Sequence, residues 1–197
     1  TVAAARARFF RDKLYEAEQD MDGAFAAYVE ADRLLDAARE DARRISILGG
    51  MAIFLVYNRQ DYAQADSILT VAMQLVERTD PGAVMHANTM QLHGTVKRRQ
   101  QQYALADSFY AAAHERYLEV LAPDHAQVAS LQDVWATSLE EQERYDEAIA
   151  LYEKAYATGL RIYGAEHMQL GTFANNYANC LRKAGRHEEA VPLFERA

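Results

Sequence analysis

The sequence is poor in cysteine, proline and glycine. Its 197 residues include one cysteine, three prolines and nine glycines. The lone cysteine, Cys180, cannot form a disulfide within the chain, and it is too few for a zinc site built on cysteines. With so few helix breakers, long helices are favoured over a β fold with many tight turns.

The sequence also lacks an excess of basic residues and any long apolar run. Its formal net charge is −8, which argues against nucleic acid or an anionic membrane as partner, because both need a basic surface. The longest apolar run, Met51 to Tyr57, is far too short to span a bilayer, and residues 1–6 offer no apolar core for a signal peptide. We therefore expect a cytoplasmic protein. Since the chain begins without methionine and ends inside a predicted helix, we expect it to be a fragment of a longer protein.

A motif recurs every 41 or 42 residues. Its clearest copies are Asp61-Tyr62-Ala63-Gln64-Ala65-Asp66, Gln102-Tyr103-Ala104-Leu105-Ala106-Asp107 and Arg144-Tyr145-Asp146-Glu147-Ala148-Ile149, with further copies at residues 20–25 and 186–191. The alanines shared by all copies, called the frame alanines here, are Ala24, Ala65, Ala106, Ala148 and Ala190. Five copies in step predict a repeat architecture.

Large and small side chains follow each frame alanine at fixed spacings. Four residues later stand Tyr28, Leu69, Tyr110, Tyr152 and Phe194, and three further on stand Ala31, Ala72, Ala113, Ala155 and Ala197. Spacings of four and three place these side chains on one helical face. The small residues would let a neighbouring helix approach closely, while the large ones fill the space between helices.

Each repeat therefore reads as two antiparallel helices. In the last repeat we expect the first helix from Met168 to Lys183, a turn with Gly185 in the left-handed conformation, and a second helix from about His187. Asp61 is the expected N-cap of a second helix, with Gln64 three residues on. Asp80 and Pro81 read as the N-cap and first position of another helix.

We divide the chain into repeats at about 4–41, 42–82, 83–124, 125–166 and 167–197, forming one domain. Between the first two repeats, residues 36–44 must turn without proline or glycine. Gly49 and Gly50 fall inside a predicted helix, where each is unfavourable by about 1 kcal/mol relative to alanine. Close backbone packing or a bend would explain them.

The pattern resembles the tetratricopeptide repeat, and its length is similar to that of the longer repeats of the kinesin light chain family. The segments Leu121-Ala122-Pro123-Asp124-His125 and Thr172-Phe173-Ala174-Asn175-Asn176-Tyr177-Ala178 carry the resemblance best. It implies an all-α fold, an α-solenoid in which about five helix-turn-helix units form a right-handed superhelix. Since many unrelated proteins contain such repeats, it indicates fold more strongly than function.

In this family the first helices line the concave side, which implies a set of groove positions. Counted back from the frame alanines, the predicted peptide-binding residues are Phe54, Tyr57, Asn88, Gln91, Thr95, Arg98, Asp133, Thr137, Asn175, Asn179 and Arg182. Repeat one contributes Arg6, Phe9, Lys13 and Glu16, and the frame also passes through Ile47, Gly50, Ser130, Glu140 and Thr172.

These residues suggest an extended protein or peptide guest. Amides can donate and accept hydrogen bonds with its backbone, Arg98 and Arg182 can pair with its carboxylates, and Phe54 and Tyr57 can hold an apolar anchor. Simpler readings compete with these: the polar residues suit a solvated surface, and the two aromatics suit packing between repeats. The clamp for chaperone tails needs a lysine and asparagine set that is missing here. The Asn175-Asn176 pair alone matches the kinesin light chain groove, so a kinesin cargo motif is not the expected partner.

No catalytic or cofactor motif accompanies the repeats, and we predict neither an enzyme nor a bound cofactor or metal. None of the six histidines is spaced three or four residues from another, as a helical metal pair requires. Gly49-Gly50 lacks the lysine and the spacing of a phosphate-binding loop. Glu140, Glu141 and Glu143 read as a solvated acidic turn.

Two other functions stay open. Similar arrays adjoin kinases and transcription regulators in bacterial signalling proteins, so the chain would there be a ligand-sensing regulatory domain. Alternatively it self-assembles into a homo-oligomer through an open solenoid end, because Leu181, Phe194 and Tyr177 are expected to be poorly covered.

Overall fold

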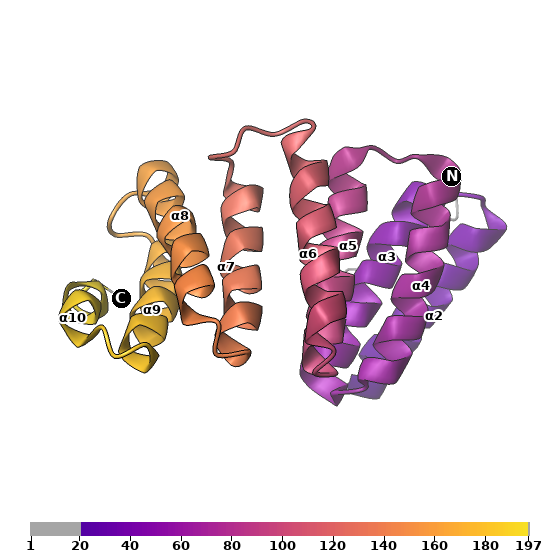
Figure 1. The fold of residues 1–197 in the computed structure, drawn as a ribbon. Coiled ribbons are helices and arrows are strands. Elements are labelled where there is room, and N and C mark those ends of the chain that lie inside the picture. Colours follow the sequence, from indigo (N-terminus) through magenta and orange to yellow (C-terminus); the bar gives the residue numbers. More distant parts are fainter. Residues whose placement is uncertain (1–20, 197) are drawn as a thin grey trace. The chain divides into compact units, whose positions relative to one another are not determined.

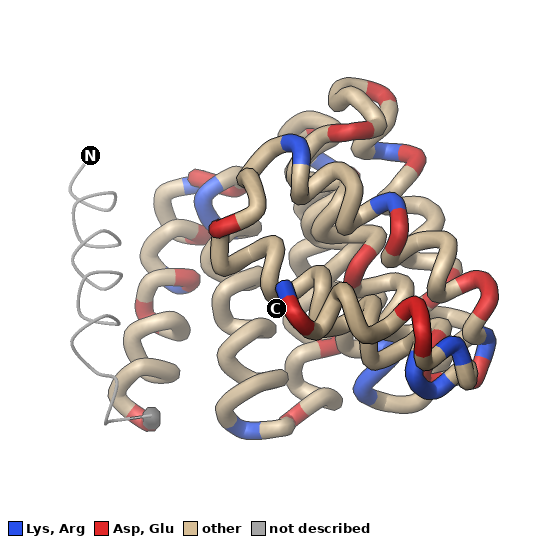
Figure 2. The backbone as a smooth tube through the Cα atoms, turned by 90° about the vertical axis from the view of Figure 1, so that its left-hand side faces the viewer, with Lys and Arg blue, Asp and Glu red and all other residues tan. Residues whose placement is uncertain are grey.

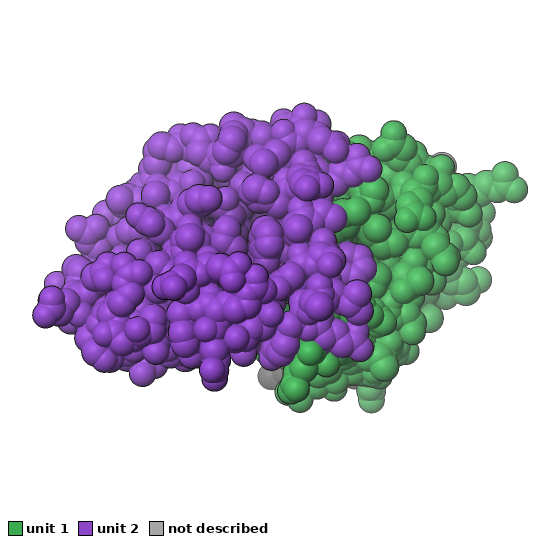
Figure 3. Space-filling model, in the orientation of Figure 1, with its two compact units in different colours: residues 1–101 green, residues 102–197 purple. Residues whose placement is uncertain are grey.

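A computed structural model describes residues 21–196, and all the regular elements in that range are helices (Figure 1). The groove positions predicted in repeat one, Arg6, Phe9, Lys13 and Glu16, lie outside the described residues, as does Ala197. The helices form two compact units, residues 1–101 and residues 102–197 (Figure 3). The boundary falls within the third repeat, and the division of the chain into domains stays a prediction.

Unit 1 contains α2 (Met21–Ala37), α3 (Asp41–Phe54), the π-helical turn η1 (Leu55–Arg59), α4 (Tyr62–Thr79) and α5 (Ala83–Arg99). Each α-helix packs against the next in the chain, and α3 also contacts α5. Buried side chains of α3 and α4, among them Leu48, Met51 and Val76, form much of the core. The arrangement matches paired antiparallel helices of successive repeats.

Unit 2 contains α6 (Tyr103–Leu118), α7 (Ala126–Glu141), α8 (Tyr145–Tyr163), α9 (Met168–Lys183) and α10 (His187–Phe194). Consecutive helices pack together, and the two first helices α7 and α9 touch. The largest core cluster joins α7, α8, α9 and α10 and includes Leu139, Tyr152 and Leu181.

The small and large positions of the repeat occupy the core as predicted. All five frame alanines are buried, as are Ala31, Ala72, Ala113 and Ala155. The large residues Leu69, Tyr110 and Tyr152 are buried too, whereas Phe194 at the end of α10 is 40% exposed. Leu181 was expected to be poorly covered, and this is wrong: it is buried in the cluster with α10. Tyr177 is half-buried, its ring stacked on Tyr152 with centroids 6.4 Å apart.

Several predicted helix ends are confirmed. Helix α9 spans Met168–Lys183, and α10 begins at His187. The Asp61 carboxylate accepts a hydrogen bond of 3.0 Å from the backbone N–H of Gln64. One prediction is wrong: Asp80 does not cap α5. Its N–H bonds to the Val76 carbonyl and closes α4, while Gly82 with φ 98° precedes α5.

The turns inside the hairpins share a left-handed residue five positions before the frame alanine. It is Gln60 in the second repeat, Gln101 in the third, Glu143 in the fourth and Gly185 in the fifth, with φ between 54° and 79°. The link between the first two repeats uses another such residue, Arg39 with φ 54°. Left-handed backbone therefore replaces the missing glycine and proline there.

Close packing explains the glycine pair in α3. A Cβ on Gly50 would lie 2.9 Å from the Tyr28 ring of α2, and one on Gly49 would lie 3.3 Å from Leu92 of α5. Neighbouring helices thus approach the α3 backbone on two sides, which decides between the two explanations offered by the sequence. Within the described residues, no helix has both the length and the apolar character needed to cross a membrane.

Candidate functional site

The predicted groove residues lie on the first helices of the repeats, namely α3 with η1, α5, α7 and α9, and they differ in exposure. Asn88, Asn175 and Arg182 are exposed, as is Tyr57, whereas Thr95, Arg98 and Asp133 are buried. Phe54, Gln91, Thr137 and Asn179 are half-buried. Of the eleven predicted residues, four are therefore exposed to a partner, four are half-buried, and three belong to the packing beneath the face.

The two predicted aromatic anchors of unit 1 have different surroundings. Phe54 stacks on Phe25 with ring centroids 6.1 Å apart and lies 6.2 Å from Tyr28, so much of its surface is used between α2 and α3. Tyr57, on η1, is 59% exposed, and the Arg99 guanidinium lies 5.8 Å from its ring centroid. A cation beside an exposed ring can stabilise its orientation. Tyr57 is thus the aromatic that a guest can reach.

Helix α5 is tied to α4 by a polar cluster beside its predicted groove positions. The Asp66 carboxylate of α4 lies 3.0 Å from His93 Nε2 and 2.7 Å from Lys97 Nζ. Burial lowers the pKa of His93, although Asp66 acts in the opposite direction. On the same helix, Thr95 Oγ1 donates to the Gln91 carbonyl at 3.1 Å. These bonds fix the helix that presents Asn88 and Gln91.

In unit 2, a buried carboxylate joins the first helices of two repeats. The Asn176 side-chain amide of α9 donates to both carboxylate oxygens of Asp133 on α7, at 3.1 Å and 3.2 Å. Burial raises the pKa of Asp133 to about 6, the Asn176 hydrogen bond lowers it, and the nearby Glu140 raises it further. Asp133 is therefore a carboxylate whose charge is poorly stabilised by its surroundings.

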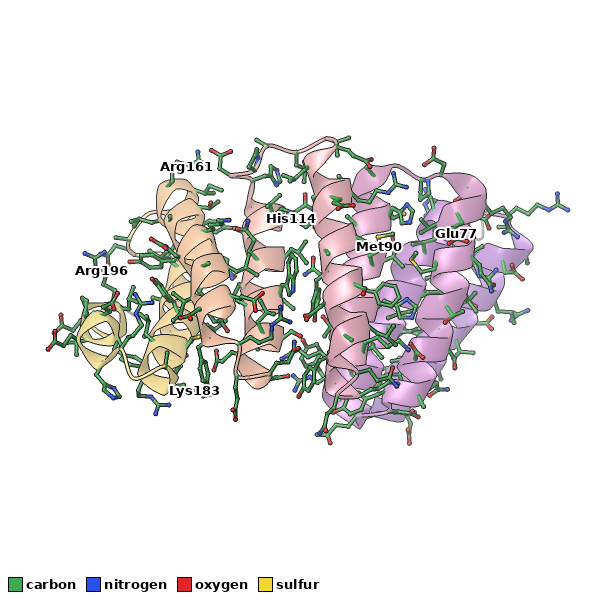
Figure 4. All side chains as sticks on the ribbon, in the orientation of Figure 1. Glu77, Met90, His114, Arg161, Lys183 and Arg196 are labelled. Carbon is green, nitrogen blue, oxygen red and sulfur yellow. The ribbon has the colours of Figure 1, made fainter. Side chains whose placement is uncertain are left out.

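A chain of hydrogen bonds begins on α7 at Thr137, one turn after Asp133. Thr137 Oγ1 lies 3.0 Å from the Tyr152 hydroxyl of α8, and that hydroxyl donates to Glu140 at 3.0 Å. The second oxygen of Glu140 pairs with Lys183 Nζ at 2.7 Å. Lys183 lies at the C-terminal end of α9, as labelled in Figure 4. Burial also raises the pKa of Tyr152, so its phenol stays a hydrogen-bond donor.

A ladder of polar side chains lies along α9. The Asn179 amide donates to the Asn175 backbone carbonyl at 2.9 Å, and Arg182 donates to the Asn179 side-chain oxygen at 3.5 Å. The spacing of four and three residues keeps these groups on one helical face. This ladder offers amide donors and acceptors and one guanidinium to a partner.

Asn176, Tyr152 and Lys183 were not predicted as site residues, and Glu140 was placed at a groove position but interpreted as part of a solvated acidic turn. The Asn175-Asn176 pair and the position of Glu140 in the repeat frame were available signals. Spacing alone did not show that Asn176 points at α7, or that Lys183 reaches back to Glu140. Charged residues of both signs are interspersed along the backbone (Figure 2). In residues 21–196, no group of three His, Cys, Asp or Glu side chains could hold a metal ion.

The profile of the tetratricopeptide repeat matches residues 86–158 and 127–197, which together make up more than half of the chain. The chain belongs to the tetratricopeptide repeat family. No curated protein matches its sequence significantly.

Solved structures of other tetratricopeptide repeat proteins share the fold. A putative kinesin light chain from Podosopora anserina with nearly identical repeats is 15% identical, with a TM-score of 0.74 over 98% of this chain and 92% of that chain. RapI in its apo form is 14% identical, with a TM-score of 0.79 over 96% and 68%. MamA from Desulfovibrio magneticus RS-1 is 17% identical, with a TM-score of 0.64 over 97% and 92%. At these identities the likeness confirms the fold, an all-helical repeat stack, and the resemblance to kinesin light chain repeats.

Proposed function

We propose that this tetratricopeptide repeat protein is a non-catalytic scaffold that binds an extended segment of another protein on its first-helix face. Stacked repeats of this kind present long surfaces suited to binding, and the family's role as an interaction scaffold supports the proposal. The observation that carries it is the α9 ladder of Asn175, Asn179 and Arg182, in which the two ends are exposed.

The chemistry of this ladder suits a peptide backbone. A peptide in extended conformation has one N–H and one C=O per residue to pair, and an asparagine amide can satisfy both kinds of group. Arg182 adds a charged donor at one end. In unit 1, exposed Tyr57 offers an aromatic surface for an apolar side chain. Arg98 and Thr95 are buried, so the proposal places contacts with the guest on the exposed members of the predicted set.

A random linear peptide library displayed on phage tests the proposal. Peptides selected on the wild-type chain are synthesised, and their affinities are measured for wild type, for the double variant Asn175→Ala and Asn179→Ala, and for Glu153→Ala. Glu153 is an exposed residue of the second helix α8 and is the matched control. We expect the double variant to weaken binding by about tenfold, equivalent to about 1.4 kcal/mol, and the control to leave it unchanged. Equal affinities for all three proteins would refute binding on the first-helix face.

A further inference from the structure

The π-helical turn η1 adds one residue to the first helix of repeat two. In the last hairpin, the N–H of Arg186 donates to the Leu181 carbonyl five residues earlier, at 2.9 Å, and the fourth hairpin has an equivalent bond. In the second hairpin, the N–H of Asp61 donates to the Leu55 carbonyl six residues earlier, at 3.1 Å. Arg186 and Asp61 both stand four residues before a frame alanine, so the extra residue lies within η1.

The extra residue shifts α3 by one position relative to the repeat frame. Gly94, Ala136 and Ala178, which stand twelve residues before their frame alanines, are buried small residues. The same count in repeat two reaches Ile53, which is 44% exposed, whereas the buried small residue is Ala52, at 1%. Each residue of α3 therefore occupies the structural position that belongs to the next residue in the other repeats.

Contacts between helices show the same shift. Asp107, the residue after a frame alanine, accepts a hydrogen bond from Ser138, which stands ten residues before the next frame alanine. Phe25 also follows a frame alanine, but its ring stacks on Phe54, which stands eleven residues before the next one. Phe54 therefore faces the second helix α2 of the preceding repeat, as Ser138 faces α6.

Contacts between successive first helices agree with this shift. Asn176 of α9 and Leu92 of α5 both stand fourteen residues before their frame alanines. Asn176 is bonded to Asp133 of α7, fifteen residues before its frame alanine. Leu92 instead lies against Gly49 of α3, sixteen residues before its frame alanine. The shift therefore holds along α3 from Gly49 to Phe54.

The shift places Ile53, rather than Phe54, on the first-helix face of unit 1. The other described repeats have polar residues at the equivalent position, namely Thr95, Thr137 and Asn179. In repeat two the position is apolar, and the Ile53 side chain is 44% exposed. Tyr57, which is 59% exposed, follows one turn later on the same side of the helix. Unit 1 therefore presents two exposed apolar side chains where the other first helices present polar ones.

A cation lies beside this apolar pair. The Arg99 guanidinium of α5 lies 5.8 Å from the centroid of the Tyr57 ring, and Arg99 is exposed. Within the part of the chain that the structure describes, Arg99 takes part in no ion pair. It can therefore bind a carboxylate of a partner without giving up an ion pair of the fold.

We infer that Ile53 and Tyr57 receive an apolar side chain of the guest segment, and that Arg99 pairs with a neighbouring carboxylate of that segment. This inference rests on the proposed function and specifies the chemistry of the guest in unit 1. An apolar side chain packed on Ile53 and Tyr57 removes apolar surface of both partners from water. The guanidinium favours an acidic neighbour of that side chain and repels a basic one. The guest is therefore recognised by an apolar residue with an acidic residue beside it.

The binding test uses the same random phage library, selected separately on wild type and on Ile53→Gln. Peptides selected on wild type are synthesised, and their affinities are measured for wild type, Ile53→Gln, Arg99→Gln, Phe54→Leu and Val71→Gln. Val71 is an exposed apolar residue of the second helix α4 in the same unit, so its variant is the matched control for Ile53→Gln. Thermal unfolding verifies that each variant is folded.

The inference predicts that an apolar residue beside an acidic one is enriched on wild type and not on Ile53→Gln. Ile53→Gln should weaken binding by about tenfold and Arg99→Gln by about threefold. Phe54→Leu, which keeps an apolar side chain towards α2, and Val71→Gln should leave affinity unchanged.

Two results would overturn the inference and leave the proposed function standing. One is a set of peptides that need Asn175 and Asn179 but are indifferent to Ile53→Gln. The other is a set weakened by Phe54→Leu and not by Ile53→Gln, because the unshifted frame would then describe the face. Peptides that need neither the two asparagines nor Ile53 would overturn both.

Deleting Asn58 tests the shift of α3 without a ligand. Asn58 is an exposed residue of η1, and its removal gives the second hairpin the length of the fourth and fifth. We expect a melting temperature within about 3 °C of wild type. Deletion of Glu141, at the equivalent exposed position of the fourth hairpin, should lower it by about 10 °C or more, because α7 then loses its phase. Equal losses for the two deletions would remove the shift and overturn the inference.

Discussion

In unit 2, the second helix of a repeat contacts the following hairpin at two equivalent places, called joints here. One joint is polar and the other is apolar. The residue after the frame alanine is Asp107 in α6 and Ile149 in α8, and in both cases it contacts the hairpin that follows. Asp107 pairs with Arg144 and accepts a hydrogen bond of 3.2 Å from Gln142, whereas Ile149 is buried in a cluster with Cys180 and Leu181. The equivalent partner residue also differs between the two joints: it is Ser138 in α7 beside Asp107 and Cys180 in α9 beside Ile149.

The comparison shows what the repeat frame determines. It determines which positions meet across a joint, because helix length and spacing are nearly constant. It leaves the chemistry of the contact free, provided that both sides match: a carboxylate meets hydroxyl, amide and guanidinium groups, and an isoleucine meets apolar groups. In unit 1, Asp66 with His93 and Lys97 is a second polar joint of the same kind.

Placing a charged residue in the apolar joint should have the largest effect on the free energy of unfolding. Ile149→Asp places an unpaired carboxylate in the apolar joint, and we expect a loss of about 3–5 kcal/mol in the free energy of unfolding. Urea unfolding followed by circular dichroism measures it. Ala150→Asp is the control, because residue 150 is exposed. A loss below that of the control would show that the joint tolerates charge.

Removing the poorly compensated carboxylate of Asp133 should increase stability. Because the pKa of Asp133 is raised to about 6, the fold loses stability as pH rises from about 4 to about 6, where Asp133 would ionise in the unfolded chain but not in the folded one. Asp133→Asn should therefore be more stable than wild type by about 3 kcal/mol above pH 6. The difference should vanish below pH 4. Unfolding measured at pH 4 and pH 8 compares the two, and an equal difference at both values would contradict this account.

Adding volume to the apolar joint should have an intermediate effect. A Cβ on Gly159 of α8 would lie 2.7 Å from the Phe173 ring of α9, so Gly159→Val forces the helices apart. We expect a loss of about 1–3 kcal/mol. The double variant Gly159→Val with Phe173→Leu should be less destabilised than the two single variants predict, since leucine removes the obstructing ring. Thermal unfolding of the four proteins tests this coupling.

The smallest expected effect on stability comes from the histidine caps of α7 and α9, the first helices at the two joints. His125 Nδ1 accepts the N–H of Gln127 at 3.2 Å, and His167 Nδ1 accepts that of Gln169 at 3.0 Å. Each histidine therefore caps a first helix. Replacing either with alanine should lower stability by roughly 0.5–1 kcal/mol, and asparagine should retain most of it. Similar losses at both sites would show that capping is independent of joint chemistry, whereas a loss at neither would remove the capping role.

The sequence alone predicted the helices and their buried faces, because the periodicity of alanine and large residues reports helical phase directly. The limits of α9 and the capping of α4 by Asp61 follow from such local signals. Asp80 was misassigned because its sequence, followed by proline, suits a helix start, whereas the backbone N–H of Asp80 is needed to close α4.

The candidate site stays a prediction, drawn from the family resemblance and the repeat frame. These placed Asn175 and Arg182 at positions that are exposed, but they also selected Arg98, which is buried. Which part of a first helix reaches solvent depends on how each repeat is rotated against the next, and this rotation is set by packing over many residues. The bond from Asn176 to Asp133 depends on that rotation, so spacing within a single repeat could not reveal it.

The left-handed residue in each hairpin turn bears on redesign of the protein. Three repeats place glutamine or glutamate at this position, and the last places Gly185. A residue with a Cβ is disfavoured there by about 1 kcal/mol, while glycine adopts the conformation freely. Replacing Gln60, Gln101 and Glu143 with glycine, as in the fifth hairpin, would raise the melting temperature without changing the exposed face of either helix. The result would be a more thermostable variant in which the residues of the binding surface can be exchanged.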